Sequence, residues 1–209
     1  MNATAAGRPR DPAIDAAALT ATLAVLGEHG YAGFAIETVA SRAGTSKAAI
    51  RRRWPARQRL IIDALASVLV TPPTPDNGCT RCDLYDTVRL LATALHDHLP
   101  SAVLTPLIAD CANDAELHQY LMDTLIAPSR QAATIAVDRA VRRGDLRPDL
   151  DPTLLVGLLA SVVYQRALFG DAPIGEAAVG PLVDVLLRGV AVDFGKLLRI
   201  SEDRKRHRH

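Results

Sequence analysis

Aromatic side chains make up only 4% of this 209-residue chain, and it contains three cysteines, two methionines and one tryptophan. It has no sustained alternation of β-branched and polar residues, which argues against a sheet protein. The N-terminus lacks the apolar segment of a secretion signal, and the longest apolar run, 154–163, is too short to cross a bilayer. We therefore expect an all-α protein located in the cytoplasm.

Apolar residues are plentiful, at 49% of the chain, and Ala and Leu, which favour helices, are abundant among them. This content is ample for a buried core, and the length suits one large or two modest domains. The composition of residues 71–80 predicts a loop, and this loop is the one obvious boundary in the sequence.

The net charge of +1 hides an uneven distribution along the chain. Residues 1–70 contain nine Lys and Arg against five Asp and Glu, a net charge of +4. Residues 71–209 contain 15 basic against 18 acidic side chains, a net charge of −3. A basic first third on an acidic remainder indicates a nucleic-acid-binding head on a body that does not touch DNA.

The segment 36–60 has the pattern of two short helices joined by a turn. Gly44 stands where the chain must leave the first helix and reverse, a position that commonly needs positive φ. Ser46 offers an N-cap hydroxyl to the second helix. Ile50 and Trp54, four residues apart, point inward and leave small and basic residues outside. We predict a helix-turn-helix whose second helix enters the DNA major groove.

This segment resembles the DNA-binding domain of the tetracycline-repressor (TetR) family of transcriptional regulators, including its turn length. Two positions depart from the family pattern: Arg51 replaces a tyrosine that usually touches phosphate, and Ala35 replaces a Thr or Ser that often begins the supporting helix. A solvated basic helix in an unrelated helical protein is the alternative reading. The matching residues are Val39, Ala40, Ala43, Gly44, Ser46, Lys47, Ile50, Trp54, Pro55 and Leu60.

The candidate DNA contacts combine small and basic side chains, which allow close approach to base edges while holding phosphates. The resemblance adds a phosphate clamp from Arg57, at the start of the helix after Pro55. Arg8 and Arg10, in the arm of residues 1–10, are candidates for further contacts along DNA. The predicted DNA-binding residues are Arg42, Thr45, Ser46, Lys47, Ala48, Ala49, Arg51, Arg52 and Arg57.

The head should be completed by a helix from Asp11 and Pro12 to about His29. We assign residues 1–56 to a three-helix DNA-binding domain, 57–200 to a helical effector-binding and dimerisation domain, and 201–209 to a disordered charged tail. Gly180 and Pro181 either kink the last helix or mark its start. The expected body helices lie near 58–70, 82–98, 101–112, 114–126, 128–143, 152–168 and 175–191.

The segment 152–169 is apolar nearly all round, so it must be covered on most sides. With the last predicted helix it resembles the pair that forms a four-helix bundle across the two-fold axis in this family, which implies a homodimer. Burial of both helices inside one monomer is the alternative. The predicted interface residues are Leu155, Leu159, Val162, Val163, Leu182, Leu186 and Val190.

The resemblance also implies a small-molecule effector bound among the body helices. Polar or aromatic residues within apolar runs are the candidates for lining its pocket, although each one alone is more often a core or surface residue. These candidates are His98, Cys111, His118, Tyr120, Met122, Tyr164, Gln165 and Phe169.

Cys79 and Cys82 have the spacing of a metal or redox pair. Zinc would need two further ligands, and the nearest histidines, His96 and His98, lie a helix away. Redox chemistry would suit a helix N-terminus, which Cys82 approaches. Reduced thiols in a surface loop are the simpler interpretation, with Cys111 in the core. We see no metal site, cofactor motif or catalytic constellation in the sequence.

These observations predict a homodimeric, ligand-responsive transcription factor, most often a repressor in this family, on an inverted-repeat operator. Three alternatives remain open from sequence. They are a DNA-binding regulator controlled by a protein partner without a small-molecule effector, a nucleoid protein without sequence preference, and a helical enzyme with a basic head.

Overall fold

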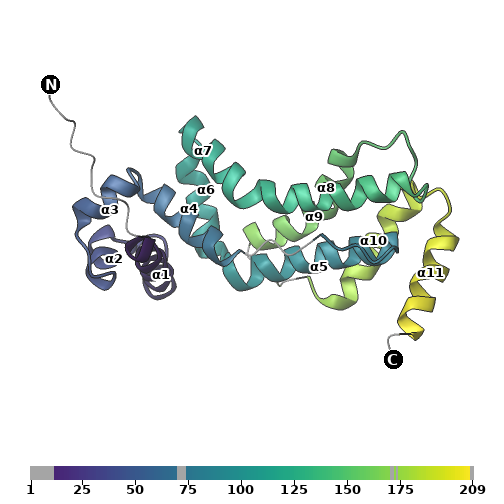
Figure 1. Cartoon of the computed structure of the whole chain (residues 1–209), viewed down its shortest axis with the longest axis horizontal. Helices are drawn as coiled ribbons and strands as arrows, with labels where there is room; N and C mark the ends of the chain where they lie inside the picture. Colours follow the sequence, from purple (N-terminus) through teal and green to yellow (C-terminus); the bar gives the residue numbers. More distant parts are fainter. Residues whose placement is uncertain (1–11, 70–73, 170–171, 173, 208–209) are drawn as a thin grey trace, which may run out of the picture. The chain divides into compact units, whose positions relative to one another are not determined.

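The computed structural model describes residues 12–69, 74–169, 172 and 174–207 (Figure 1). No strand occurs in these ranges, where the β pairing is limited to a bridge between Leu146 and Ala191. The all-α prediction is confirmed. The elements are α1 (Pro12–His29), α2 (Ile36–Arg42), α3 (Lys47–Arg53), α4 (Arg57–Val68), α5 (Thr80–His98), α6 (Ser101–Cys111), α7 (Ala115–Leu121), the π-helix η1 (Met122–Ile126), α8 (Ala127–Arg142), α9 (Pro152–Phe169), α10 (Glu176–Val190) and α11 (Phe194–Arg206).

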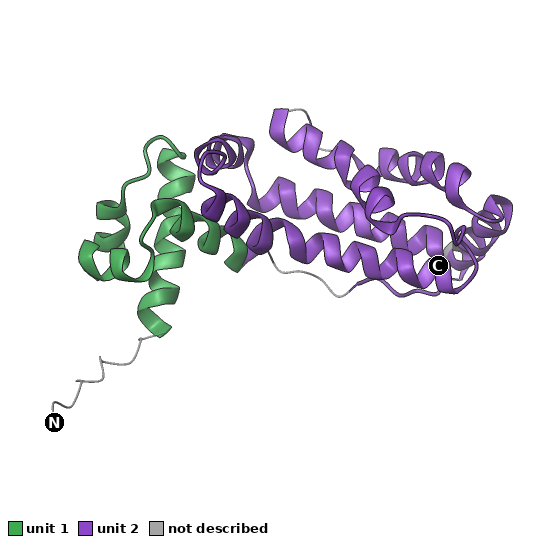
Figure 2. Ribbon diagram, turned by 90° about the horizontal axis from the view of Figure 1, so that it is seen from above, with its two compact units in different colours: residues 1–67 green, residues 68–209 purple. Residues whose placement is uncertain are grey.

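The chain divides into two compact units, residues 1–67 and 68–209 (Figure 2). The predicted boundary at residue 56 lies earlier than this division. Most of α4 belongs to the first unit, and the indole of Trp54 ties it to the end of α3 by donating a hydrogen bond to Asp63 Oδ2 at 2.7 Å. The helix after the recognition segment is therefore part of the head.

The first unit is built from short helices around a small apolar core. Gly44 adopts φ +62° between α2 and α3, as predicted, where a side chain would be strained. Val25 of α1, Val39 of α2 and Ile50 of α3 are all buried. Burial of one apolar face on each helix supplies the main stabilisation of a unit this size.

The second unit is organised around α5, which packs against α8, α9, α10 and α11 (Figure 1). Leu84, Val88 and Leu95 lie on its buried face at helical spacing. α6 packs against α7 and α9. Gly180 and Pro181 both lie inside α10, so they do not mark the start of that helix.

The predicted disordered tail is wrong for residues 201–206, which form the last turns of α11. Leu197 and Ser201, four residues apart, are buried on one face of this helix, so the segment packs in spite of its charge. No helix was predicted here because most residues of 201–206 are charged, and such a composition is typical of a disordered tail.

Helix α9, at 18 residues, is long and apolar enough to cross a membrane by length and composition alone. It is longer than the apolar run 154–163, which was judged from the sequence too short to cross a bilayer. A core helix of a water-soluble protein meets the same criterion. The contacts of α9 with α5, α6, α8 and α10 account for its buried face, whereas Leu154, Leu158 and Phe169 on the same helix are exposed.

Candidate functional site

Helix α3 presents one face to the core and the opposite face to solvent. Ser46 Oγ accepts a hydrogen bond from the Ala49 N–H at 3.1 Å, which confirms the predicted N-cap. Ile50 is 1% exposed and Trp54 is buried just after the helix ends. The buried pair fixes the rotation of α3 about its own axis, and therefore decides which side chains reach outward.

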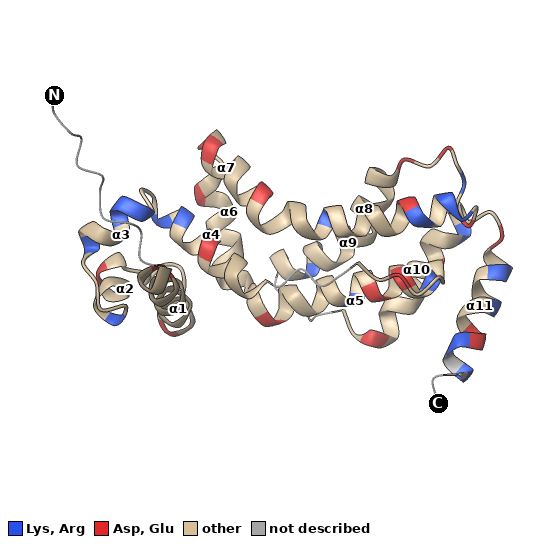
Figure 3. Ribbon diagram, in the orientation of Figure 1, with Lys and Arg blue, Asp and Glu red and all other residues tan. Residues whose placement is uncertain are grey.

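The outward face carries Ala48, Arg51 and Arg52, all of which are exposed. The basic residues of α3 are blue in Figure 3. Among the described residues, neither Arg51 nor Arg52 forms a hydrogen bond or an ion pair. Ser46 is exposed, and the other predicted contacts in the turn and helix, Thr45, Lys47 and Ala49, are half-buried. Two uncommitted guanidinium groups beside a methyl side chain can approach phosphates and base edges together.

Two predicted DNA contacts are paired with carboxylates. Arg42 donates to both carboxylate oxygens of Glu28, at 2.6 and 2.5 Å, and Lys47 donates to Glu37. The hydrogen bond from Arg42 holds the pKa of Glu28 below its usual value, and that from Lys47 does the same for Glu37. Sequence spacing did not reveal these pairs, because each joins two different helices.

The third arginine of α3 has a structural role that the sequence analysis missed. The Arg53 side chain is only 9% exposed, and its Nε donates to Asp15 of α1. Arg53 follows Ile50 by three residues, which puts it beside the buried face. This spacing could have indicated that Arg53 lies near the core. It was overlooked because Arg53 is the third of three consecutive arginines, and a basic run of this kind is typical of an outward face.

Arg57 lies at the start of α4, with its guanidinium carbon 4.9 Å from the centroid of the Tyr31 ring. This cation–π contact holds a half-buried side chain in place. Ala35 is the N-cap of α2 and makes no side-chain capping hydrogen bond, because a methyl group has no acceptor. Arg8 and Arg10 of the predicted arm lie outside the described residues.

A cavity of about 120 Å³ opens among the helices of the second unit. Its walls come from α5, η1, α8 and α9, and leucine, alanine and valine side chains dominate them. Polar atoms are few and come from Thr87, Thr124, Ser129, Arg130 and Tyr164. Such a cavity suits an apolar molecule that carries a small number of polar groups.

Tyr164 contributes a phenol hydroxyl to the lining of this cavity. Burial raises the pKa of its hydroxyl, while a hydrogen bond with Ser129 and the charge of Arg130 act in the opposite direction. The hydroxyl therefore stays neutral at physiological pH and can donate or accept a hydrogen bond.

Of the eight side chains predicted to line the pocket, Tyr164 alone does so. His98, His118, Gln165 and Phe169 are exposed, and Tyr120 and Met122 are half-buried away from the cavity. Cys111 is fully buried, and burial raises the pKa of its thiol. The prediction relied on polar side chains within apolar runs, but these mostly face solvent while the cavity is lined by the apolar residues between them.

Three of the seven predicted dimer residues point from α9 into the interior of the chain. Leu155, Leu159 and Val163 are buried inside the chain and are unavailable to a second copy. The exposed large apolar side chains of this helix are instead Leu154, at 59%, Leu158, at 45%, and Phe169 at its C-terminal end, at 77%. The sequence did not separate these faces, because α9 is apolar on both. The other four predicted residues, Val162, Leu182, Leu186 and Val190, are half-buried.

Exposed apolar side chains also occur on α10, where Val185 is 69% exposed. The exposed face of α10 includes Ala178, Pro181 and Gly189, at helical spacing from Val185. Small side chains on such a face allow another helix to approach closely. Leu154, Leu158 and Val185 together are called the apolar face below.

The cysteines differ from the predicted surface thiols. Cys79 is buried and forms a disulfide with Cys82, and Cys111 is free. Within the described ranges, no group of three or more His, Cys, Asp or Glu side chains is placed to hold a metal ion.

Two family profiles match separate parts of the chain. One, described as "Bacterial regulatory proteins, tetR family", covers residues 18–64. The other, described as "Tetracyclin repressor-like, C-terminal domain", covers residues 74–186. The first match contains the helix-turn-helix, and the second contains all the residues that line the cavity except Leu69.

Individual relatives extend over most of the chain. The DNA-binding transcriptional repressor TetR of Mycobacteroides abscessus is 31% identical over 174 residues, which are 82% of this chain and 90% of the relative. The HTH-type transcriptional regulator YdeS of Bacillus subtilis is 28% identical over 185 residues, 88% of this chain and 93% of the relative. The crystal structure of the TetR-family transcription regulator SCO0332 matches with a TM-score of 0.69 and 32% identity, covering 85% of this chain and 98% of that one.

Proposed function

Because this chain belongs to the TetR family and is a DNA-binding transcriptional regulator, we propose that it represses transcription as a ligand-responsive homodimer. In this proposal, α3 enters the major groove, the apolar face joins two copies, and an apolar molecule in the cavity of the second unit weakens DNA binding. The protein binds operator DNA and acts in the cytoplasm. The comparisons point to regulators and not to enzymes.

The exposed face of α3 is the observation that carries the DNA-binding part of the proposal. Arg51 and Arg52 extend beyond a helix whose rotation is fixed by Ile50 and Trp54. The methyl group of Ala48 leaves room for the helix to approach base edges. We assign base readout or phosphate contact to Arg51 and Arg52, and backbone positioning to Ser46 and Thr45.

When Arg42 and Lys47 bind DNA phosphates, they exchange their ion pairs with Glu28 and Glu37 for ion pairs with DNA. Lys47 and Arg42 must leave Glu37 and Glu28, or share them, before they neutralise phosphates. The two carboxylates therefore oppose tight nonspecific binding, since DNA is itself an anion. We expect them to increase the preference for operator sequences, where extra base contacts compensate for the lost pairs.

Dimerisation sets the geometry of the operator. A two-fold dimer places two recognition helices in successive major grooves, about 34 Å apart, and therefore recognises an inverted repeat. The apolar face on α9 and α10 offers the surface for this contact, because large exposed apolar side chains are otherwise costly in water.

The ligand proposal rests on the chemistry of the cavity. Leucine, alanine and valine side chains would cover an apolar ligand, while Tyr164, Ser129 and Arg130 would meet one polar or anionic group. A ligand changes DNA affinity only by the difference between its affinities for the DNA-competent and incompetent states. Coupling of this kind is typically of order 1 to 3 kcal/mol.

Selection of bound fragments from sheared genomic DNA, followed by fluorescence anisotropy on the recovered sites, tests the function. We expect a few strong sites that contain an inverted repeat, and a loss of affinity of about 10³ to 10⁵ between 50 and 200 mM salt for a dimer with 6 to 10 phosphate contacts. Equal binding to all fragments would contradict sequence-specific regulation.

Titration with a fluorescent apolar probe such as N-phenylnaphthylamine tests the cavity. Ala160 lines the cavity, so Ala160→Phe should fill it and weaken probe binding by at least about tenfold. Ala109→Phe, at an exposed position on α6 outside the cavity, is the matched control. Equal binding by all three proteins would contradict a ligand site in this cavity.

A further inference from the structure

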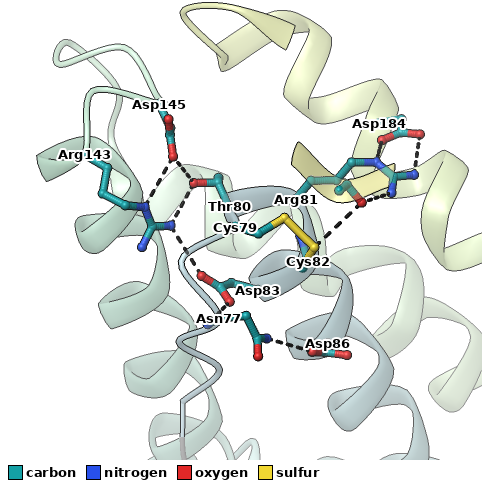
Figure 4. Close-up of a disulfide and its surroundings, with 11 residues drawn as sticks. Asn77, Cys79, Thr80, Arg81, Cys82, Asp83, Asp86, Arg143, Asp145 and Asp184 are labelled. Carbon is teal, nitrogen blue, oxygen red and sulfur yellow. Dashed lines mark hydrogen bonds and ion pairs between the residues drawn. A yellow bond between two sulfur atoms is a disulfide. The ribbon is translucent and has the colours of Figure 1, made fainter. Parts of the chain in front are cut away.

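The disulfide between Cys79 and Cys82 closes a small ring at the start of α5 (Figure 4). Its Cα atoms are 5.2 Å apart, and the chain enters the ring through Gly78, at φ +65°. The two residues inside the ring are Thr80 and Arg81. Each of them anchors a different part of the second unit.

Thr80 connects the ring to the segment between α8 and α9. Its hydroxyl donates to Asp145 Oδ2 at 2.7 Å and accepts a hydrogen bond from the Arg143 guanidinium at 2.8 Å. Arg143 also lies 3.3 Å from Asp83, one turn further along α5. Thr80, Asp83 and Asp145 are all buried, so these hydrogen bonds have little competition from water.

Arg81 connects the ring to α10 and α11 (Figure 4). It donates to both carboxylate oxygens of Asp184, at 2.6 and 2.9 Å, and to Ser201 Oγ at 2.9 Å. The Ser201 hydroxyl is also 3.7 Å from the sulfur of Cys82. One side chain from the ring thus holds both C-terminal helices, and α11 contacts the disulfide directly.

We propose that Cys79 and Cys82 are a reversible thiol–disulfide pair whose oxidation fastens α10 and α11 to the start of α5. The ring fixes the backbone from which Thr80 and Arg81 project. When it opens, the first turn of α5 keeps its helical hydrogen bond from the Asp83 N–H to the Cys79 carbonyl, at 2.9 Å, but loses the covalent constraint. The response is a local loosening and not unfolding.

The surroundings of the two sulfurs suit exchange with thiols. Cys79 is the N-cap of α5, and its sulfur accepts the Cys82 N–H at 3.3 Å. A helix N-terminus stabilises a thiolate, so Cys79 is the better leaving group. Cys79 is buried and Cys82 is half-buried, which makes Cys82 the sulfur that an incoming thiolate attacks.

The exchange balances with a dithiol as the reductant. One thiolate of the dithiol bonds to Cys82 and releases Cys79 as a thiolate, which takes up a proton. The second thiolate of the reagent then bonds to the first reagent sulfur and releases Cys82. The products are two protein thiols and the cyclic disulfide of the reagent, and the reverse sequence oxidises the protein.

A reversible role also fits the compartment, and this step rests on the proposed function. A protein that acts on cytoplasmic DNA works where thiols are kept reduced, and disulfides in that compartment are usually transient or redox-sensing. Oxidation of the cytoplasm would form the disulfide and constrain Thr80 and Arg81. Because Arg81 binds Asp184 of α10 and Ser201 of α11, the packing of these two helices would then depend on the redox state.

Counting thiols tests whether the pair is reversible. The full chain is equilibrated with mixtures of reduced and oxidised dithiothreitol, quenched with iodoacetamide in denaturant and weighed by mass spectrometry. We expect one alkylated cysteine, Cys111, at the oxidising end and three at the reducing end, with a single two-electron transition. Three labels throughout, or one label until the protein unfolds, would each overturn the proposal.

Hydrogen exchange without DNA tests the fastening, so its result does not depend on the proposed regulation. Amides of α11 should exchange about tenfold faster in the reduced protein, the size expected for a disulfide that closes so short a loop. The Cys79→Ser/Cys82→Ser variant should show the fast rate in either buffer, and Cys111→Ala should keep the redox dependence. Equal α11 exchange in oxidised and reduced wild-type protein would overturn the fastening.

Discussion

Arg53 of α3 forms an ion pair with Asp15 of α1, while its neighbour Arg52 points into solvent. Three consecutive arginines are thus divided between two roles. The first two belong to the candidate DNA face, and the third holds the recognition helix on the helix that supports it.

This division predicts opposite phenotypes for adjacent substitutions. Arg52→Ala should lower operator affinity by about 1 to 3 kcal/mol and leave stability nearly unchanged. Arg53→Ala removes a largely buried side chain and its ion pair with Asp15, and should lower the free energy of unfolding by about 1 to 3 kcal/mol. Anisotropy titrations and urea unfolding of both variants separate the effects. Equal stability losses would contradict the assignment.

Removal of a carboxylate from the candidate DNA face should strengthen binding. Glu37→Gln releases Lys47 from its ion pair and removes a negative charge near the phosphates. We expect tighter binding to random-sequence DNA and a salt slope steeper by about one phosphate contact. Glu176→Gln, on α10, is the control for the change in net charge alone. An unchanged slope for Glu37→Gln would remove Lys47 from the interface.

The indole of Trp54 makes both a packing and a hydrogen-bonding contribution. Trp54→Ala should cost about 3 to 5 kcal/mol of stability, because it leaves a cavity beside α4. Trp54→Phe keeps much of the packing but loses the donor to Asp63, and should cost less, about 1 to 3 kcal/mol. Thermal unfolding of the two variants gives the order. A larger loss for Phe than for Ala would contradict this account.

Charged side chains on the apolar face should separate the proposed dimer. Leu158→Lys and Val185→Lys each place a charge at an exposed apolar position, and we expect both to sediment as monomers and to bind the inverted repeat at least tenfold more weakly, since a single head loses the second half-site. Ile135→Lys, at an exposed apolar position on α8, is the matched control. Dimers of unchanged affinity in both variants would place the interface elsewhere.

Asp83 makes a pH-dependent contribution to stability. Burial raises its pKa above the usual value of 3.8, although Asn77 and Arg143 oppose the shift. In the native state it therefore holds its proton to higher pH than in the unfolded state. Its stabilising contribution is complete below pH 3.8 and is lost as the pH rises through the raised pKa.

Asp83→Asn removes this titration. The free energy of unfolding of the wild type, minus that of the variant, should fall as the pH rises from below 3.8 to neutrality. Urea unfolding across this range measures it, and any constant offset from the lost contact with Arg143 does not change the slope. A difference that rises with pH would show that the ion pair with Arg143 outweighs burial.

Local patterns in the sequence were sufficient for the recognition segment. Gly44, Ser46, Ile50 and Trp54 act through interactions within a few residues of themselves, so spacing alone indicates the turn, the cap and the buried face. The same holds for the start of α9, where Asp151 accepts hydrogen bonds from the Thr153 and Leu154 amides. Because these interactions join residues that are close in sequence, the sequence alone was enough to identify the family resemblance and to predict the all-α fold.

Only the tertiary structure decided which residues far apart in the chain meet. Arg53 finds Asp15, Arg81 reaches Asp184 and Ser201, and α11 packs where a charged tail was expected. Helix α9 has leucine on both faces, so composition could not distinguish its buried Leu155 from its exposed Leu158. The sequence by itself determined the helices, their caps and the DNA-binding segment, whereas the cavity, the apolar face and the anchored disulfide depend on long-range packing, which local spacing does not encode.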